Sequence, residues 1–257
     1  GSGEFAADCH LTVTEQIETA KAKVSNKISN GKYIAYFQSF TNTYGDINYL
    51  RKIFMEAIRH PDIVALSIGT RPDCLPDDVL YLLDELNHIK PVWIELGLQT
   101  IHEHTARYIN RGYSLDVFDR AVCKLCALHI DVIVHLIIGL PFESKSDILD
   151  SVKYVCSKPI SGIKLQLLHV LKDTPLEKEY LLNKFNVLSL EKYTEILSEC
   201  LCNIPPDIVI HRITGDGPKS LLVAPIWSAN KKRVLNYINR YFEDFDIRQG
   251  KSLDSPL

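Results

Sequence analysis

Short apolar runs recur along the chain, and polar, charged or helix-patterned segments separate them. Each run is nearly continuous in apolar residues, which is typical of strands that are buried on both faces of a parallel sheet. We predict strands at Tyr33–Phe37, Ile63–Ile68, Val92–Leu98, Val132–Ile138 and Gly162–Leu168, and a sixth at Asp207–Ile213.

The segments between these strands carry apolar residues at spacings of three and four, the pattern of a helix with one buried face. Thr12 and Glu15 have the spacing of a capping box, and Pro61 ends one of the helical segments. We predict helices from Thr12 to about Asn26 and over Asp46–His60, Pro76–His88, Ser114–Leu128, Ser144–Cys156, Pro175–Leu182, Leu190–Cys202 and Trp227–Phe242.

Alternating strands and helices of this length indicate right-handed crossovers and a parallel α/β sheet. We predict a barrel or partial barrel, with a doubly wound sheet as the alternative. No Gly-x-Gly-x-x-Gly follows the first strand, which counts against a dinucleotide fold. We expect residues 1–170 to form the barrel and residues 171–257 to form a helical extension packed on it.

Composition narrows the class of protein. The chain has 257 residues, 46% hydrophobic and 24% charged, with a net charge of −3, so a core can form and a globally basic nucleic-acid coat is excluded. The longest apolar run, Ile130–Leu140, is interrupted by Asp131 and His135, so we expect no membrane span. Seven cysteines and the lack of a signal-peptide pattern favour a reducing cytoplasm.

Polar residues gather where the predicted strands end, which is where parallel α/β barrels place their chemistry. Helix caps explain some of them, but Gln, Arg and Lys are not capping types. These positions favour a pocket for a polar ligand with several functional groups: Gln38, Thr41, Asn42, Thr43, Arg71, Asp73, Glu95, Gln99, His135, Lys164, Gln166 and His169.

In combination and order, several motifs resemble the radical S-adenosylmethionine (SAM) enzymes. The resemblance is strongest to the YhcC/YtqA-type family, which is itself similar to the radical SAM domain of the elongator catalytic subunit. The motifs are Tyr36–Gln38, Thr41–Thr43, Thr70–Asp73, Glu95–Thr100, Asn110–Gly112, His135–Pro141, Gly162–Leu165, His211–Ile213 and Ala224–Trp227.

This resemblance implies a partial (β/α)6-type radical SAM barrel that uses SAM and a [4Fe-4S] cluster. In such enzymes an electron from the cluster cleaves SAM into methionine and a 5′-deoxyadenosyl radical, which abstracts a substrate hydrogen. It also implies transfer RNA as the partner, with a substituent of a wobble uridine as the target, and an electron donor such as flavodoxin or ferredoxin.

The resemblance also assigns roles to residues. Arg111 would pair with the methionyl carboxylate, Gln99 would contact the ribose, and residues 41–43 would meet the methionyl amine; a helix cap is the alternative for Arg111 and a buried histidine for His135. The implied SAM-binding set is Gln38, Thr41, Asn42, Thr43, Asp73, Glu95, Gln99, Arg111, His135, Gly139, Leu140 and Pro141. The implied substrate set is Lys164, His169, His211 and Arg212.

The cysteines depart from the family pattern. The family holds its cluster with a C-x3-C-x2-C loop, whereas successive cysteines here are 65, 49, 3, 30, 44 and 2 positions apart. We therefore expect this chain to bind no cluster and to be inactive as it stands. Gly1–Ala6 resembles the stretch after that loop, so we expect the first strand and the loop to be missing; a cloning scar is the alternative.

Two other features leave alternatives open. Cys123 and Cys126 have metal-ligand spacing and could share zinc with Cys200 and Cys202, although buried thiols are the simpler reading. A basic stretch near the end could touch RNA or could be a solvated helix face: Trp227, Lys231, Lys232, Arg233, Arg240 and Tyr241.

Two functions compete with the radical enzyme. One is a non-catalytic barrel module that binds SAM or RNA. The other is a phosphate-binding hydrolase or lyase, which would need a carboxylate pair, and the strand ends offer only Glu95 and Asp73 on separate strands.

Overall fold

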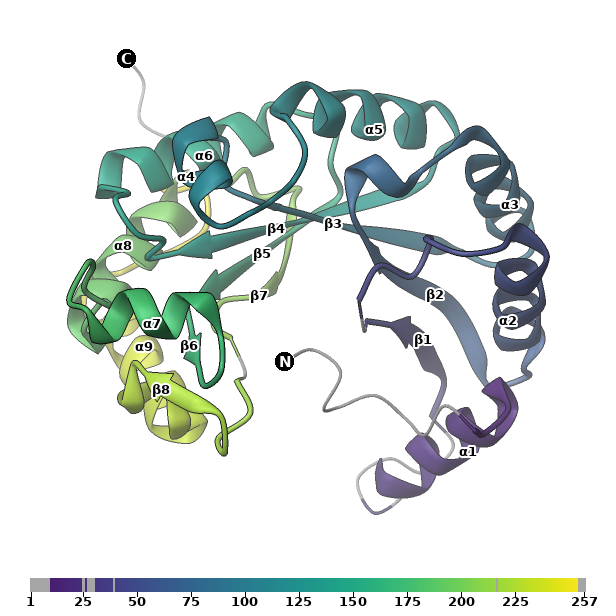
Figure 1. Cartoon of the computed structure of the whole chain (residues 1–257), viewed down its shortest axis with the longest axis horizontal. Coiled ribbons are helices and arrows are strands. Elements are labelled where there is room, and N and C mark those ends of the chain that lie inside the picture. The colour runs from purple at the N-terminus through teal and green to yellow at the C-terminus, as the bar shows by residue number, and fades with distance from the viewer. Residues whose placement is uncertain (1–9, 25, 27–30, 39, 216, 254–257) are drawn as a thin grey trace. The chain divides into compact units, whose positions relative to one another are not determined.

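One six-stranded sheet, in the order β1-β2-β3-β4-β5-β7, organises the computed structural model (Figure 1). The registered pairs β1–β2, β2–β3 and β5–β7 are parallel. The strands are β1 (Tyr33–Phe37), β2 (Ile63–Thr70), β3 (Val92–Gln99), β4 (Asp131–Ile138), β5 (Gly162–Leu167) and β7 (Val209–Arg212).

Helices fill the connections between strands. They are α1 (Val13–Val24), α2 (Ile47–Arg59), α3 (Asp77–Asn87), α4 (Glu103–Tyr108), α5 (Leu115–Ala127), α6 (Lys145–Cys156), α7 (Pro175–Leu181), α8 (Leu190–Cys202) and α9 (Lys231–Asp244). Short 3-10 turns lie at Pro72–Cys74 and Ile226–Ala229, and a small antiparallel pair joins β6 (Val170–Leu171) to β8 (Leu222–Ala224).

The structure describes residues 10–24, 26, 31–38, 40–215 and 217–253. The amino-terminal stretch Gly1–Ala6, Cys9 and Asp216 lie outside the described residues. The chain divides into two units: the amino-terminal unit holds residues up to 97 together with 116–133, and the carboxy-terminal unit holds residues 98–115 and those from 134 onward.

In the amino-terminal unit, α2 covers one face of the first two strands. Asp46 caps this helix by accepting hydrogen bonds from the backbone N–H groups of Asn48 and Tyr49. The buried side of α2 includes Phe54, whose ring meets Phe37 of β1 edge to face at 4.9 Å between centroids. Figure 1 shows α2 and α3 side by side on this face.

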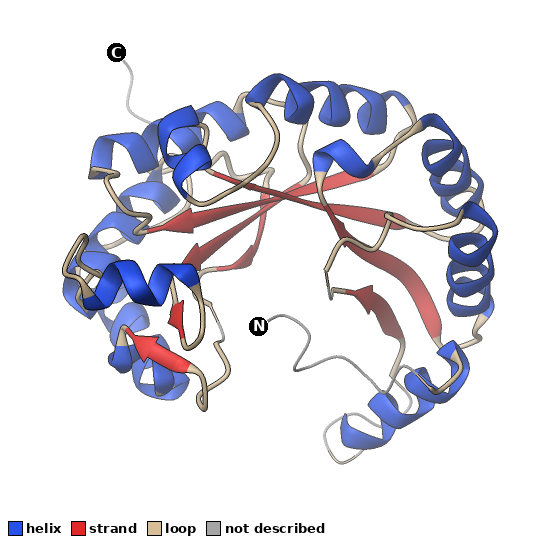
Figure 2. Cartoon of the chain, in the orientation of Figure 1, coloured by secondary structure: helices blue, strands red, loops and turns tan. Residues whose placement is uncertain are grey.

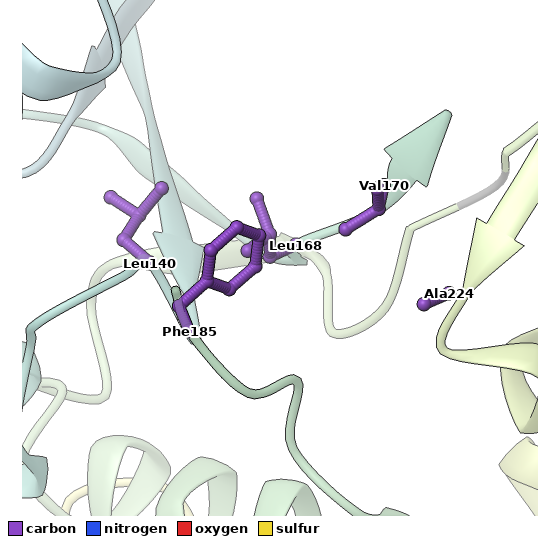
Figure 3. Close-up of a cluster of buried hydrophobic side chains, with 5 residues drawn as sticks. All are labelled: Leu140, Leu168, Val170, Phe185 and Ala224. Atoms are coloured by element: carbon purple, nitrogen blue, oxygen red, sulfur yellow. The ribbon is translucent and has the colours of Figure 1, made fainter. Parts of the chain in front are cut away.

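In the carboxy-terminal unit, a second apolar cluster ties the small β6–β8 pair to its surroundings. Figure 2 shows this pair close to α7 and α9. The ring of Phe185 lies against Leu140 and Leu168, and Val170 and Ala224 come from the two paired strands (Figure 3). This cluster fixes the turn after β4, because Leu140 belongs to both.

The predicted parallel α/β fold is confirmed, and the strand order decides between its two forms. A doubly wound sheet reverses its order at a switch point, whereas here each new strand is added at the same edge. The predicted helices and strands all occur, although the last helix begins at Lys231 because Ile226–Ala229 forms a separate 3-10 turn. The boundary between residues 170 and 171 stays a prediction.

Three short elements were not predicted: α4, β6 and β8. Two or three paired residues are too few to show a period, so the sequence gives no signal for β6 or β8. Among the described residues, none of the helices has the length and apolar character needed to cross a bilayer.

Replacing Gly139 by Ala should destabilise the protein. Gly139 has φ +91°, and a Cβ there would lie 3.0 Å from Leu188 Cδ1. We expect a loss of about 1–2 kcal/mol in the free energy of unfolding, measured by urea titration. Gly45→Ala is the control, because a Cβ there meets Leu50 at an ordinary 3.7 Å; equal stability of the two variants would contradict the prediction.

Candidate functional site

The predicted site residues are divided between the two units. The amino-terminal unit holds Gln38, Thr41, Asn42, Thr43, Asp73 and Glu95. The carboxy-terminal unit holds Gln99, Arg111, His135, Gly139, Leu140, Pro141, Lys164, His169, His211 and Arg212. The expectation that both groups line one cavity stays a prediction.

The loop after β1 is fastened to the end of β2 through Asn42. Both amide hydrogens of Asn42 are donated to backbone carbonyls, those of Phe37 and Gly69, each at 2.9 Å. The backbone N–H of Asn42 also bonds Gly69 O at 3.2 Å. Gly69 permits this approach, because a Cβ there would lie 3.3 Å from Phe37 O. Asn42 Oδ1 accepts no hydrogen bond from the described residues and stays available as an acceptor.

Thr43, the next residue of the same loop, is held by hydrogen bonds of its side chain. Its buried hydroxyl donates to Cys74 O and lies against the hydroxyl of Thr70. Thr70 must therefore donate to Thr43, because Thr43 has only one hydroxyl hydrogen. In the same loop, Thr41 is half-buried and Gln38 is exposed.

A buried carboxylate joins the first three strands. Glu95 on β3 is only 4% exposed, and it accepts hydrogen bonds from Tyr36 of β1 and Ser67 of β2, both at 2.7 Å. One carboxylate oxygen serves each hydroxyl, which stabilises a charge that burial would otherwise oppose.

Asp73 already has a cationic partner. The guanidinium of Arg71 donates to both of its carboxylate oxygens, at 2.9 and 2.7 Å. This bidentate pair holds the pKa of Asp73 below its usual value. A ribose contact from Asp73 would share oxygens with Arg71, and that role stays a prediction.

Gln99 ends β3 in an unusual backbone conformation. Its φ is +70°, and the next residue, Thr100, donates its backbone N–H to Leu98 O at 2.9 Å. This bond closes a γ-turn of the left-handed, strained kind. Such strain in a residue other than glycine is concentrated at functional sites and needs surrounding bonds to hold it.

Thr100 supplies those bonds. It is fully buried, its hydroxyl donates to Glu143, and the same oxygen accepts the backbone N–H of His102 at 3.0 Å. Its carbonyl accepts a bond from Arg111 Nη1 at 2.6 Å. Burial raises the pKa of Glu143, and the bond from Thr100 opposes that shift.

Arg111 has a structural role of its own. Its side chain is 2% exposed, and its donors reach Tyr113 O at 3.0 Å and the carboxylate of Glu103 at 2.8 Å in addition to Thr100 O. Glu103 also accepts the backbone N–H of Leu115 at 2.9 Å. Three of the five guanidinium N–H groups are thus engaged, and pairing with a methionyl carboxylate stays a prediction.

The predicted site residues on β4 and in the turn after it have two environments. His135 Nδ1 lies 3.0 Å from Gln166 Nε2, so the half-buried imidazole accepts a hydrogen bond there. Leu140 and Pro141 are buried in the turn, which places their side chains in packing. The backbone contact to adenine that the resemblance implies at Gly139–Pro141 stays a prediction.

The substrate-side residues lie on β5, β7 and the segment between them. Lys164 is buried on β5 and its Cα is registered opposite Arg212 of β7, while His211 is exposed. Lys164 and His211 each make interactions within the protein. Their contact with a substrate stays a prediction.

His169 is held in one tautomer. Ser228 donates its only hydroxyl hydrogen to Pro225 O at 2.8 Å, so His169 Nε2, 3.1 Å from Ser228 Oγ, must be the donor. The ring lies against Gly215 and Gly217, and a Cβ at Gly215 would fall 2.8 Å from the ring's Cε1. The two glycines therefore permit the close approach of the histidine.

The described cysteines do not suit a [4Fe-4S] cluster. A cluster that leaves one iron open requires three neighbouring thiolates. Within the described ranges the sole grouping of three metal-ligating side chains is Glu18, His60 and Asp62, which contains no cysteine. Cys123 and Cys126 are exposed on α5, contrary to the buried-thiol interpretation, whereas Cys200 and Cys202 are buried as that interpretation expects.

The Glu18–His60–Asp62 group is itself an ion-pair cluster and not a metal site. The Lys21 ammonium lies 2.7 Å from both carboxylates. His60 Nδ1 accepts the backbone N–H of Asp62 at 3.2 Å, so Nε2 carries the proton and donates to Glu18 at 2.9 Å. A metal on Nε2 would need the tautomer with its proton on Nδ1, and the backbone N–H of Asp62 would then lose its acceptor.

Several residues of these sites were not predicted. Glu143, Thr100 and Ser228 act through hydrogen bonds between segments distant in sequence, which no local spacing reveals. Ser67 had no periodic signal either, because Ala65 and Gly69 stand at the alternate positions on either side of it.

Comparison with known proteins places the chain in a family. The Radical SAM superfamily model matches residues 9–155, and a model described as the Radical_SAM C-terminal domain matches residues 160–244. YtqA of Bacillus subtilis is 44% identical over 251 residues, covering 98% of this chain and 78% of that protein. YhcC of Escherichia coli is 35% identical over 252 residues, covering 97% and 80%.

The fold agrees with a solved structure. The archaeal Methanocaldococcus infernus Elp3 with an amino-terminal deletion superposes with a TM-score of 0.78 at 20% identity, covering 92% of this chain and 59% of that one. The molecule is thus a partial radical SAM-type α/β barrel with a helical carboxy-terminal part. The chain belongs to the radical SAM superfamily, whose members use SAM and a [4Fe-4S] cluster.

Thr100→Val should destabilise the carboxy-terminal unit. The change keeps the shape but removes the Thr100 donor from Glu143 and leaves the backbone N–H of His102 without an acceptor. We expect a loss of about 1–3 kcal/mol in the free energy of unfolding, measured by urea titration. Thr100→Ser keeps the hydroxyl and should recover most of the loss; a Val variant as stable as the Ser variant would refute the role of these bonds.

Lys21→Met should remove an acid-dependent part of stability. Lys21 lowers the pKa of both Glu18 and Asp62, so their contribution is present above the pKa values of the unfolded chain and is lost as pH falls through the folded values. The melting temperature of the variant should lie below that of the wild type near neutral pH, and the two should converge in acid.

Lys23→Met on the same helix is the matched control, because Lys23 is exposed and has no ion pair among the described residues. A difference between Lys21→Met and the wild type that persists unchanged in acid would rule out this linkage. Added salt should shrink the difference near neutral pH, since exposed charges are screened.

Proposed function

We propose that the intact protein acts in radical SAM chemistry on transfer RNA, with hydrogen abstraction at a substituent of a wobble uridine as the reaction. The observation that carries the proposal is the chain's membership of the radical SAM superfamily over most of its length. The choice of RNA rests on the motif resemblance to the elongator catalytic subunit. We assign the protein to the cytoplasm on the same grounds.

The geometry of two strand ends supports SAM as a ligand. Asn42 offers an amide oxygen beside a fastened loop, which suits the donor hydrogens of a methionyl ammonium group. Gln99 stands in a strained turn held by a fully bonded Thr100, which suits a side chain that must be oriented before the ligand arrives. Each feature is complete within its own unit.

A second candidate function is a barrel module that binds SAM or RNA without catalysis. The cysteines of the described residues are compatible with it, because they bring no three thiols together.

Anaerobic reconstitution of the full-length protein with iron and sulfide separates the two candidates. The protein would be mixed with SAM, reduced flavodoxin and an unmodified transfer RNA transcript, and 5′-deoxyadenosine would be measured by mass spectrometry. Production that rises with the RNA supports the enzyme. SAM and RNA binding without 5′-deoxyadenosine supports the module, and a protein that binds neither ligand contradicts both.

A further inference from the structure

Helix α9 carries its charges in the reverse of the order that stabilises a helix. Its first three residues are Lys231, Lys232 and Arg233, and its acidic residues, Glu243 and Asp244, come only at the end. The partial charge at a helix amino terminus is positive, so cations there weaken the helix and anions strengthen it. Helix stability therefore does not explain this arrangement.

Three of the cations belong to one exposed face. Arg233, Tyr237 and Arg240 follow one another at spacings of four and three, which places them on one stripe of the helix. Lys232 is exposed next to Arg233, Tyr237 is half-buried at the edge of the stripe, and Val234 and Ile238 are buried. We call Lys232, Arg233, Tyr237 and Arg240 the α9 face.

The positive charge of the α9 face is weakly compensated. Lys232 and Arg233 form no ion pair with another described residue. The pKa of Glu191 is lowered chiefly by hydrogen bonds from its own backbone and from Ser189, and Arg233 adds a smaller effect. Arg240 meets Asp244 only at 3.7 Å between two exposed side chains. Such a pair contributes little and exchanges readily for a stronger anionic partner.

The local charge stands out because the chain as a whole is acidic. The net charge is −3, yet residues 231–240 contain four Lys or Arg and no Asp or Glu. A phosphate backbone is the polyanion that a row of Lys and Arg neutralises best, and an aromatic ring between two guanidinium groups suits a nucleotide with both charge and a flat base.

We propose that the α9 face binds the phosphate backbone of RNA and is the surface on which transfer RNA docks. This inference rests on the proposed function for the identity of the RNA, and it locates that contact on a surface outside the strand-end residues described above. Arg233 and Arg240 contact phosphates, Lys232 adds a further charge, and Tyr237 lies against a ribose or base between them.

The test compares two variants with the same change in net charge. The α9-face variant is Lys232→Glu with Arg233→Glu and Arg240→Glu. The control variant is Lys153→Glu with Lys172→Glu and Lys219→Glu, three exposed lysines elsewhere in the same unit. Binding of a fluorescent, unmodified transfer RNA transcript is measured by anisotropy over a series of salt concentrations.

We expect the α9-face variant to lose at least tenfold in affinity and the control to lose less than threefold. The slope of log affinity against log salt should become shallower by about two to three in the α9-face variant, since each lost phosphate contact removes close to one unit. A face variant that binds like the control overturns the proposal and leaves the proposed function standing.

A milder variant guards against unfolding. Lys232→Gln, Arg233→Gln and Arg240→Gln keep residues with good helix propensity and should weaken binding in the same direction with unchanged circular dichroism. If the wild-type protein does not bind the transcript, both this proposal and the proposal that RNA is the substrate are overturned. Binding to phosphatidylserine vesicles without binding to RNA overturns the proposal in favour of a membrane surface.

A separate result would contradict only the proposed hydrogen abstraction. RNA that binds through the α9 face while no 5′-deoxyadenosine forms would support the docking surface and contradict hydrogen abstraction. The two experiments therefore fail independently.

Discussion

Alternation of side chains along buried parallel strands is the constraint on which this protein depends. On β3, Val92, Ile94, Leu96 and Leu98 are almost fully buried, whereas Glu95 is a charged group at an intervening position. Successive side chains of a strand point to opposite faces, so one face can hold apolar packing while the other carries polar groups. Gln99 ends the same strand four residues after Glu95.

Much of the fold could be predicted because its strands are nearly continuous apolar runs and its helices carry apolar residues at spacings of three and four. Every predicted strand and helix occurs, and the sequential strand order agrees with a barrel-type winding. The elements that were not predicted are α4, with six residues, and the paired strands β6 and β8, with two and three residues. Such elements form because the surrounding chain supplies partners, as Val170 and Ala224 show within the apolar cluster.

The candidate site was predictable in residue type and not in bonding. The sequence points to Gln99 and Arg111, but only coordinates show that Gln99 is in a left-handed turn and that Arg111 bonds Thr100, Tyr113 and Glu103. Glu143 had no signal, because its partner Thr100 lies on another strand end. Hydrogen bonds between distant segments decide which polar residues support the site and which remain available to a ligand.

The loop after β1 has a chemical preference built into one amide group. Asn42 spends its two hydrogens on the backbone of Phe37 and Gly69, so its side chain has only an oxygen lone pair left to offer. A ligand group that binds this oxygen must be a hydrogen-bond donor, such as an ammonium or hydroxyl group. The lone pairs of this oxygen would repel a carboxylate or a phosphate. The Asn42 oxygen would therefore favour the ammonium group of an amino acid over its carboxylate.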